Sequence, residues 1–394
     1  MVEKNVVGST RIIRQVNLAT ILDTIRLNGP LSRSNVAKMT GISLPTILRV
    51  SSDLLDADLV KAIGKGESTG GRPGELLAFN SSGNLVVGID LGGTKIVGAI
   101  VDLGGNVLSK LEENTSLENT FEQLCRTIST LLEQPRAADQ KILGIGVGLP
   151  GITQTIDGIV SMAPNLGWDD FPLQKMLKER FSIPVYIEND VNMQALGEYG
   201  FGAGVGTRNM IMISFGTGIG SGIIINGALY QGSSQSAGEI GYMIPSLEYL
   251  RPHGGGLGAL ELVASGAGIS RNAEKYLGSK NGSPQKYTAK DVFDAARGGQ
   301  DWAQAMVGEV INAITLAIVN LSVMLDPEVI VLGGGLMKSS DLLFDPIQKN
   351  LHNLVPINPR LCVSSLGHDA GLKGAAILVL NAVTESHVLY PITQ

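Results

Sequence analysis

Two stretches of this chain follow the same plan: a strand-length apolar run, a glycine-rich turn and a second apolar run. "IDLGGTK" (89–95) contains the turn in the first stretch, Asn84–Leu108, and "GTGIGSG" (216–222) forms it in the second, Asn209–Gly232. An internal duplication of this kind predicts two lobes, each with one glycine hairpin. If the hairpins face each other across a cleft, their backbone N–H groups can bind phosphate oxygens without side-chain bulk in the way.

The composition sets limits on the class of protein. The chain has 394 residues, 44% hydrophobic and 17% charged, which suits a globular protein of two or three domains. Its longest apolar runs are strand-sized, and a membrane span needs roughly 20 residues, so no membrane helix is expected. The N-terminus lacks a secretory pattern. Cys125 and Cys362 have no disulfide-framework or metal-ligand spacing, and a reducing cytoplasm fits this usage best.

Positive charge is concentrated at the N-terminal end. Residues 1–80 contain ten Lys and Arg and seven Asp and Glu, a surplus of three, although the whole chain carries a net charge of −6. These residues are therefore the only part of the chain that a polyanion is expected to attract.

The same N-terminal part has a helix pattern interrupted by turns. Asn17–Gly29 has apolar residues at near-helical spacing, and the helix is expected to stop at the following proline. Leu31–Val60 then predicts a short helix capped by Ser32 or Ser34, a turn at Gly41, and a second helix opened by Ser43. Two short helices across a glycine turn are typical of a helix-turn-helix.

In a helix-turn-helix, the first residues of the second helix face DNA base edges in the major groove. The residues in those places are Ser43, Leu44, Thr46 and Arg49. Lys61–Asn80 predicts two short strands around a glycine-rich tip, a wing whose Arg72 could enter the minor groove. The alternative is a small helical packing module with solvated basic residues. We favour DNA binding, because helices, turn and wing occur in a consistent order and spacing.

The remainder of the chain carries eight motifs in a characteristic order. They are "DLGGTK", "GVGLPG" (146–151), "PNLGW" (164–168), "ENDVNMQALGE" (188–198), "GTGIGSG", "AGEIGY" (237–242), "LELVASG" (260–266) and "VLGGGL" (331–336). This series resembles the ROK family of bacterial sugar kinases and sugar-responsive repressors, over roughly residues 84–380. The N-terminal "LSRSNVAKMTGISLPTILRV" and "GGRPGELLAFN" resemble the DNA-binding part of the repressors, which the plain kinases lack.

The resemblance implies a role for each matching residue. It implies a first phosphate loop formed by Asp90, Gly92, Gly93 and Thr94, and a second formed by Gly216, Thr217 and Gly218. It also implies that Gly333, Gly334 and Gly335 form a turn on the adenosine side. It implies that Asp190 is a catalytic base, and that the sugar hydroxyls are surrounded by Asn165, Asn189, Asp190, Glu239 and Glu261.

These residue types suit phosphoryl transfer to a sugar. The reaction needs a positioned, metal-neutralised triphosphate and a carboxylate that accepts the hydroxyl proton. Carboxylate and amide side chains can hold two sugar hydroxyls at once. The alternative for Asp190 and Glu239 is a structural role, capping a helix or a turn.

One region departs from the family pattern. The family usually has one His and three Cys that hold a structural zinc, and the His also contacts the sugar. Here Tyr242 has the His position, and the Cys positions are held by Pro252, Gly254 and Ala259. None of these side chains supplies a thiolate or an imidazole, and one neighbouring His253 is more typical of a surface. We therefore predict no zinc and an altered sugar contact.

The sequence thus predicts an α/β protein in which a winged helix-turn-helix precedes a two-lobed actin/hexokinase-like (ribonuclease-H-like) body. The expected domains are the winged part at 1–82, a small lobe at 83–200 with 372–394 returning to it, and a large lobe at 201–371. The favoured function is a sugar-responsive transcriptional regulator, expected to be a repressor, that binds operator DNA as a homodimer or higher homo-oligomer. The alternative is an ATP-dependent sugar kinase with a DNA-binding domain, which would use Mg-ATP.

Overall fold

The computed structural model describes residues 10–66, 74–250, 257–281, 286–352 and 354–384. The chain divides into two compact units. Unit 1 comprises 1–193, 226–229 and 371–394, and unit 2 comprises 194–225 and 230–370. The predicted boundary at residue 82 lies within unit 1, where the N-terminal part and the first sheet cluster together. The three-domain division therefore stays a prediction.

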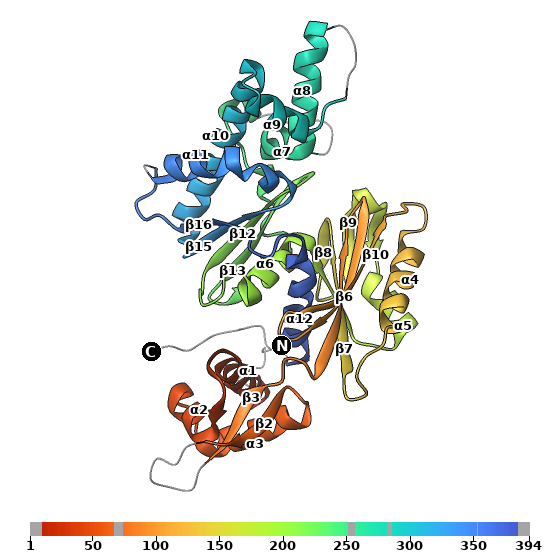
Figure 1. The fold of residues 1–394 in the computed structure, drawn as a ribbon, viewed down its shortest axis with the longest axis vertical. Helices are drawn as coiled ribbons and strands as arrows, with labels where there is room; N and C mark the ends of the chain where they lie inside the picture. The colour runs from red at the N-terminus through yellow and green to blue at the C-terminus, as the bar shows by residue number, and fades with distance from the viewer. Residues whose placement is uncertain (1–9, 67–73, 251–256, 282–285, 353, 385–394) are drawn as a thin grey trace, which may run out of the picture. The chain divides into compact units, whose positions relative to one another are not determined.

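The N-terminal part is a winged helix-turn-helix, as predicted (Figure 1). Its three-stranded sheet has the order β1-β3-β2. Its elements are α1 (Thr10–Asn28), β1 (Leu31–Ser32), α2 (Arg33–Thr40), α3 (Leu44–Asp56), β2 (Val60–Lys65) and β3 (Glu75–Phe79). Ser32 caps α2, because its Oγ accepts from Asn35 N at 3.2 Å. Gly41 ends α2 in the left-handed region, at φ +69°, where glycine carries no penalty.

The first helix is longer than the predicted Asn17–Gly29. It begins at Thr10 and ends at Asn28. In the added first turns, two apolar side chains that the structure describes are exposed, Ile13 by 58% and Val16 by 51%. An amphipathic pattern therefore could not reveal these turns, although a helix once nucleated extends readily.

A buried acid lies in the middle of α1. Asp23 is 1% exposed, and its Oδ2 has no hydrogen-bond partner in the described part of the chain. Its Oδ1 lies 3.4 Å from Nε of Arg26. Burial raises the pKa of Asp23 from 3.8 to about 6, and Arg26 opposes this shift only in part.

We expect Asp23→Asn to stabilise the protein at neutral pH. Since the folded-state pKa is raised, the cost of the charge is absent below about pH 4 and complete above about pH 6. Since the raised pKa already includes the opposing effect of Arg26, removing the charge should raise the free energy of unfolding at pH 7.5 by up to about 3 kcal/mol. Urea unfolding followed by circular dichroism at pH 4 and pH 7.5 measures this. Equal stability of variant and wild type at both pH values would contradict it.

The main sheet of unit 1 has five strands in the order β11-β7-β4-β5-β6. Its strands are β4 (Asn84–Leu91), β5 (Lys95–Asp102), β6 (Val107–Asn114), β7 (Lys141–Leu149) and β11 (Val185–Asn189). β4 and β5 form the predicted antiparallel hairpin, and β4, β7 and β11 run parallel. A second sheet has the order β10-β9-β8, from β8 (Ile152–Gln154), β9 (Ile159–Ala163) and β10 (Trp168–Phe171).

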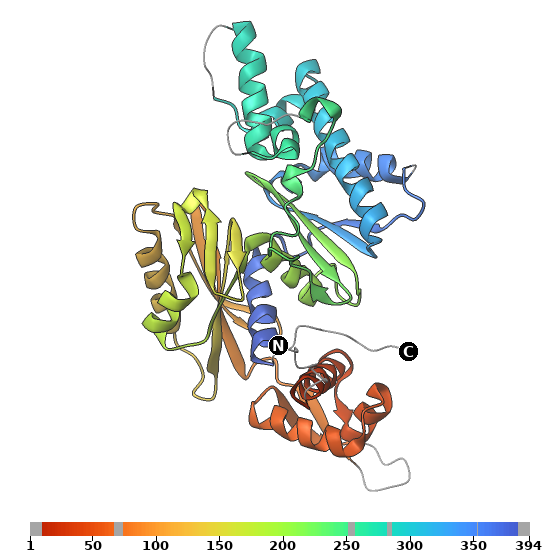
Figure 2. The same ribbon diagram turned by 180° about the vertical axis from the view of Figure 1, so that it is seen from behind.

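Helices cover both faces of the main sheet in unit 1, as the two views in Figures 1 and 2 show. On one face lie α4 (Thr120–Leu132) and α5 (Leu173–Phe181), and on the other lies α12 (Ala370–Val383). Glycines in the strands allow α12 to approach closely: a Cβ on Gly88 would lie 2.8 Å from the Leu372 carbonyl oxygen. A Cβ on Gly146 would lie 2.8 Å from Cβ of Ala375.

Unit 2 is built around a second five-stranded sheet, in the order β14-β13-β12-β15-β16. Four of its strands belong to unit 2, namely β12 (Met210–Phe215), β13 (Ile219–Ile225), β15 (Val329–Gly333) and β16 (Arg360–Val363), whereas the edge strand β14 (Ala228–Leu229) belongs to unit 1. β12 and β13 form the second predicted hairpin. The other helices are α6 (Asp190–Phe201), which begins in unit 1, and α7 (Ala259–Ala264), α8 (Gly266–Asn281), α9 (Ala289–Arg297), α10 (Asp301–Leu325) and α11 (Ser340–His352).

The core of unit 2 forms between this sheet and its helices, with Phe215, Phe293 and Ile314 among its buried side chains. The central helix α10 is long and apolar enough to cross a membrane by length and composition, but half of its most apolar window is buried inside the protein. A core helix meets the same criterion, so this is weak evidence for a membrane span.

Candidate DNA-binding, phosphate and sugar sites

The predicted DNA-contacting residues lie at the start of α3. Ser43, Leu44 and Arg49 are exposed, and Thr46 is half-buried. Ser43 Oγ and Thr46 Oγ1 share a hydrogen bond of 2.9 Å. The opposite side of α3 is fixed in the core by Ile47, Val50 and Leu54. The helix therefore presents a defined outer face, and Arg72, the predicted wing contact, lies outside the described residues.

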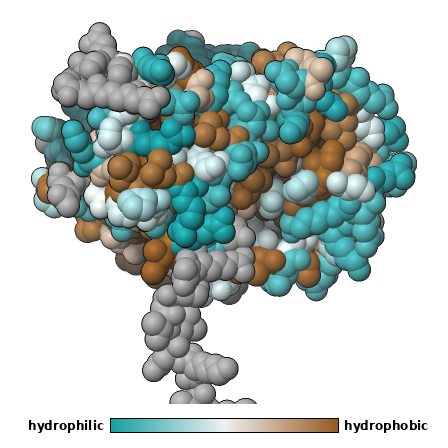
Figure 3. Space-filling model, turned by 90° about the horizontal axis from the view of Figure 1, so that it is seen from below, coloured by the Kyte–Doolittle hydropathy of each residue, from teal (hydrophilic) through white to brown (hydrophobic). Residues whose placement is uncertain are grey.

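Sequence reasoning missed Leu48 on that outer face. Leu48 is 52% exposed and Leu44 is 45% exposed. The two are four residues apart, and this spacing places them on one side of a helix, so it could have identified Leu48. Apolar side chains beside an arginine suit a major groove, where they contact thymine methyl groups. Figure 3 shows apolar groups lying among hydrophilic groups on one face of the molecule.

Two arginines of the winged part are held by carboxylates. Arg33 donates to Glu75 Oε2 at 2.8 Å and to Ser51 Oγ at 2.9 Å. Arg14 donates to Asp53 Oδ2 at 2.8 Å. Arg33 thus joins α2 to α3 and β3, and Arg14 joins α1 to α3. Because both are held in this way, Arg49 is a better candidate for DNA contact than either.

The first glycine hairpin connects β4 to β5. Gly92 N donates to the Lys95 carbonyl at 2.8 Å, and the Thr115 hydroxyl donates to the Gly92 carbonyl at 2.7 Å. Within the described residues, the N–H groups of Gly93 and Thr94 donate to no protein acceptor. Two donors on a fixed turn suit an anionic oxygen.

Two acidic side chains lie near this hairpin. Asp90 is the second-last residue of β4, opposite Gly148 of β7, and Asp190 directly follows the end of β11. Burial raises the pKa of Asp90 to about 7, the neighbouring charge of Asp190 adds to the rise, and Lys110 opposes it. Burial also raises the pKa of Asp190, although the Val191 N–H bonded to its Oδ1 at 2.9 Å opposes this.

This carboxylate pair fits a magnesium ion that also binds phosphates. Mg²⁺ commonly uses one or two carboxylates and completes its coordination with water and phosphate oxygens. Burial is the main cause of the raised Asp90 pKa, and a cation would offset the repulsion by Asp190 that adds to it. In the described part of the chain, no group of three His, Cys, Asp or Glu side chains could hold a metal ion. Among the described residues, Asp90 and Asp190 therefore have no third ligand of these types.

The predicted sugar residues of unit 1 lie around the same edge of the sheet. Asn165 is exposed on a short 3-10 helix, and a Cβ on Gly93 would lie 3.3 Å from its Cβ. Asn189 acts as the helix cap of α6: its Oδ1 accepts from Val191 N at 2.9 Å and Asn192 N at 3.2 Å. Its Nδ2 donates to the Gly151 carbonyl at 3.1 Å. Asn189 thus holds Asp190 at the start of the helix.

The second glycine hairpin connects β12 to β13 in unit 2. Gly216 N donates to the Gly218 carbonyl at 2.9 Å, and Gly266 N donates to the Gly216 carbonyl at 2.8 Å. Within the described residues, the N–H groups of Thr217 and Gly218 donate to no protein acceptor. Like the first hairpin, this turn therefore presents two N–H donors that suit an anionic oxygen.

Glu261 holds the second hairpin in place. Its Oε1 accepts from Ile219 N and its Oε2 from Gly258 N, both at 2.8 Å. The first bond fixes the start of β13, and the second caps α7. Each oxygen keeps a further lone pair for a sugar hydroxyl. The other predicted sugar ligand of this unit, Glu239, is exposed just before a short 3-10 helix (Ile240–Tyr242).

The predicted adenosine-side turn follows β15. Ser214 of β12 and Gly333 of β15 are paired in register, so this turn and the second hairpin lie at the same end of the sheet. Gly334 has φ +85°, and a Cβ there would lie 2.4 Å from the Phe215 carbonyl oxygen. Ligands commonly bind beyond the carboxyl ends of parallel strands.

The zinc positions of the family are only partly described. Tyr242 is 59% exposed and Ala259 is 3% exposed, and Pro252 and Gly254 lie outside the described residues. The absence of zinc stays a prediction that elemental analysis of the purified protein can test. Both cysteines are free thiols.

Glu198 has a structural role that sequence reasoning did not assign. It is fully buried on α6. Its carboxylate accepts from Ser364 Oγ at 2.5 Å, Ala203 N at 2.8 Å and Leu366 N at 3.1 Å. A carboxylate inside the otherwise apolar stretch "MQALGEYGF" was the available signal, because such a group must find buried donors.

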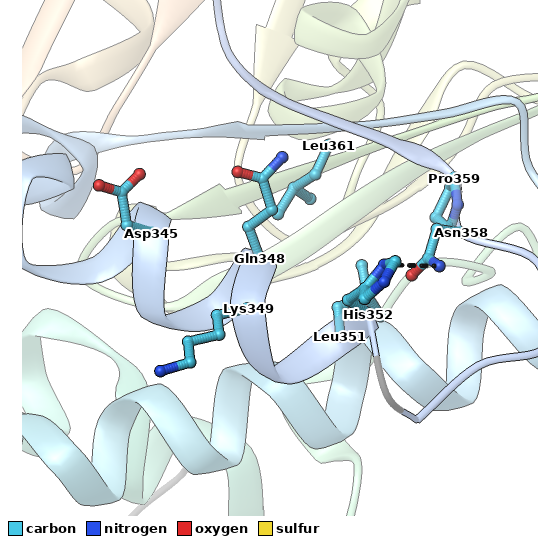
Figure 4. Close-up of a pocket in the computed structure, with 8 residues that line it drawn as sticks. All are labelled: Asp345, Gln348, Lys349, Leu351, His352, Asn358, Pro359 and Leu361. Carbon is cyan, nitrogen blue, oxygen red and sulfur yellow. Dashed lines mark hydrogen bonds between the residues drawn. The ribbon is translucent and has the colours of Figure 1, made fainter.

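A separate cavity of about 450 Å³ lies at the C-terminal end of α11 (Figure 4). His352 Nδ1 and Asn358 Nδ2 lie 3.4 Å apart at one end of it, and Asp345 lies toward the other end. None of the predicted phosphate or sugar residues lines it, so we do not assign the sugar site to this cavity.

Comparison with known proteins bears on the whole chain. The ROK family matches residues 86–382. The xylose repressor of Caldicellulosiruptor bescii is 29% identical over 391 residues, which cover 95% of this chain and 98% of the repressor.

Two solved structures are similar. A ROK family transcriptional regulator, described as a homologue of the E. coli MLC protein, has a TM-score of 0.80 and 25% identity, and the match covers 95% of this chain and 100% of the regulator. A ROK family glucokinase from Streptomyces griseus, in complex with glucose and AMPPNP, has a TM-score of 0.63 and 31% identity, covering 75% of this chain and 98% of the enzyme. These matches confirm the predicted fold, and the chain belongs to the ROK family.

Proposed function

We propose that this protein is a sugar-responsive transcriptional repressor of carbohydrate metabolism. The observation that carries the proposal is the winged helix-turn-helix in front of the ROK body, because the likeness to a repressor and to a transcriptional regulator spans 95% of the chain. The likeness to a glucokinase spans only 75% of it. The additional fifth of the chain, 95% less 75%, is the part with the exposed recognition helix.

In this proposal α3 enters the major groove with Ser43, Leu44, Thr46 and Arg49, and Arg72 of the wing reaches the minor groove. The protein binds as a homodimer, since two-fold symmetric operators are the usual targets of helix-turn-helix proteins. It acts in the cytoplasm, where the operator is located.

The proposed sugar ligands are Asn165, Asn189 and Asp190 in unit 1 and Glu239 and Glu261 in unit 2. Their carboxylate and amide groups suit vicinal hydroxyls. A sugar that binds one conformation of the protein more tightly than another shifts the population toward it. Operator affinity then changes by the same coupling free energy, so that sugar releases the protein from DNA.

A second function, sugar phosphorylation, is favoured by the two glycine hairpins. Both present N–H groups without a protein acceptor in the described residues, at Gly93 and Thr94 and at Thr217 and Gly218. We propose that these donors hold the phosphates of ATP, that Asp90 faces a phosphate-bound Mg²⁺, and that Gly333, Gly334 and Gly335 adjoin the adenosine. Asp190 would then accept the proton of the attacking sugar hydroxyl. Both functions can coexist in one chain.

A thermal-shift screen tests the sugar part of the proposal. The full-length protein is heated with single hexoses, pentoses and N-acetylhexosamines, each with and without Mg-ATP. A ligand that binds only the folded state raises the melting temperature. We expect at least one sugar to do so without ATP. A screen in which no sugar shifts the melting temperature would contradict the proposal that the protein senses a sugar.

We expect Arg49→Ala to weaken operator binding by about 1–3 kcal/mol, because the guanidinium contacts a base edge or a phosphate. Arg72→Ala should act similarly at the wing. Sugar affinity should stay unchanged in both variants. Arg126→Ala is the matched control, since Arg126 is an exposed arginine on α4, outside the winged part. Electrophoretic mobility shifts with the operator measure the difference, and equal affinities for Arg49→Ala and Arg126→Ala would exclude the proposed docking.

A further inference from the structure

The winged part is tied to the first sheet by a buried amide network. The Asp58 carbonyl accepts from Nδ2 of Asn80 and from Nδ2 of Asn84, both at 3.1 Å. Asp58 Oδ1 also accepts from Nδ2 of Asn80, at 2.9 Å. Asn80 is 7% exposed and Asn84 is 2% exposed. Asp58 follows the recognition helix α3 closely, whereas Asn84 is the first residue of β4, so these bonds join the two parts.

The residues between Asn80 and Asn84 are also held in place. The Ser81 carbonyl accepts from Leu103 N at 2.9 Å, and the Gly83 carbonyl accepts from Lys141 N at 3.4 Å. The Ser82 carbonyl accepts from Nε2 of Gln140 at 3.1 Å. The three consecutive carbonyls thus extend the hydrogen bonding of the sheet up to the winged part, and the connection is not a free linker.

The packing around Gly83 is too close for a side chain unless Asn80 and Asp58 move. A Cβ on Gly83 would lie 2.1 Å from Nδ2 of Asn80 and 2.8 Å from Oδ2 of Asp58. Contacts shorter than about 3 Å force neighbouring atoms to move. The close packing and the hydrogen bonds therefore both hold Asn80 and Asp58, and Asn84 is held by its hydrogen bond.

The strand that starts at this connection ends at the candidate ligand site. β4 carries Asn84 at its first position and Asp90 six residues later, roughly 20 Å away at about 3.3 Å per residue. β4 lies between β7 and β5, hydrogen-bonded on both sides. Such a strand moves as a rigid element, so a displacement at Asp90 also moves Asn84.

From these contacts we infer that Asp58, Asn80 and Asn84, here named the junction lock, are positioning residues for regulation. They transmit the sugar-bound state of unit 1 to the recognition helix, because β4 and α3 can then move only together. The inference rests on the proposed function and adds the route by which the sugar signal reaches DNA.

The test uses the full-length Asn80→Ala/Asn84→Ala double variant and a sugar identified in the thermal-shift screen. Operator affinity is measured with and without saturating sugar, and sugar affinity by calorimetry. In the wild type we expect sugar to weaken operator affinity by about 5–150-fold. In the variant, sugar affinity should stay within about twofold of wild type, while the effect of sugar on operator affinity falls to about twofold or less.

Asn106→Ala is the matched control. Its Nδ2 donates to Asp102 Oδ2 at 2.9 Å at the end of β5, outside the junction lock. It loses a comparable amide hydrogen bond and should respond to sugar as the wild type does. If the double variant does not bind sugar because it misfolds, the single Asn84→Ala variant takes its place. Its ratio of operator affinity without sugar to operator affinity with sugar is then compared with that of the wild type.

The outcomes separate the two proposals. A wild type that binds a sugar but keeps its operator affinity overturns the proposed function and the lock together. A responsive wild type with an equally responsive lock variant overturns only the lock. A responsive wild type and control, with an unresponsive lock variant that still binds sugar, support both.

Discussion

An Asp190→Asn variant should lose sugar phosphorylation by about 10²–10⁴-fold and keep sugar-dependent release from DNA, if the wild type phosphorylates the sugar that it senses. Asparagine can still hydrogen-bond the sugar hydroxyl, but it cannot accept the proton. The Val191 N–H that bonds to Oδ1 of Asp190 has an oxygen acceptor in either residue, so the start of α6 should keep its geometry. ADP formation and operator release with the same sugar measure the two effects.

Asp169→Asn is a suitable control, since Asp169 is an exposed aspartate on β10 of the same unit. It removes an equal charge at a position to which we assign no role, so both activities should stay at wild-type levels. Loss of sugar binding in Asp190→Asn would contradict this expectation, because it would show that an asparagine amide cannot replace the carboxylate as a ligand of the sugar hydroxyl.

The second large effect is expected at Gly334. Gly334→Ala should destabilise the protein by about 2–6 kcal/mol, from about 1–3 kcal/mol for a backbone conformation (φ +85°, ψ 174°) that is essentially confined to glycine and about 1–3 kcal/mol for overpacking. A Cβ there would lie within 2.6 Å of the N, C and O atoms of Phe215. Backbone atoms at the end of β12 cannot rotate away as a flexible side chain could, so β15 and β12 must separate.

Gly335→Ala provides the comparison one residue later, because a Cβ on Gly335 would meet nothing within 4 Å. That substitution should change the free energy of unfolding by no more than about 0.5 kcal/mol. Urea unfolding of the two variants measures the difference, and Mg-ATP affinity tests whether the turn also adjoins a nucleotide. Equal stabilities would show that the backbone at Gly334 is not constrained as described.

Much of the fold was predictable because its signals are local. The hairpins at Asp90–Lys95 and Phe215–Ile219, and the cap at Ser32, depend on residues only a few positions apart. Glycine turns and N-caps act at that range. The start of α1 at Thr10 was missed, since its first turns have exposed apolar residues and so lack an amphipathic pattern.

The candidate site was predicted in its residue types but not in its supporting contacts. The sequence marks Glu261 as a sugar ligand, and only the structure shows that both its oxygens hold backbone N–H groups at residues 219 and 258. Asn189 likewise caps α6. Two partners of Glu198, Ser364 and Leu366, lie more than 160 positions away in sequence. Asn80 and Asn84 share the partner Asp58, which lies more than 20 positions before them. Such contacts depend on tertiary packing, which the sequence pattern does not encode locally.

The central claim is that sugar binding lowers the affinity of this protein for DNA. The most direct test selects an operator from random DNA with the full-length protein, then titrates that complex with each sugar that raises the melting temperature. On the same preparation, ADP formation is followed with Mg-ATP to decide whether phosphorylation accompanies release. We expect at least one sugar to release the protein at concentrations near its dissociation constant, with or without ADP formation. Operator affinity that no stabilising sugar changes would contradict the account.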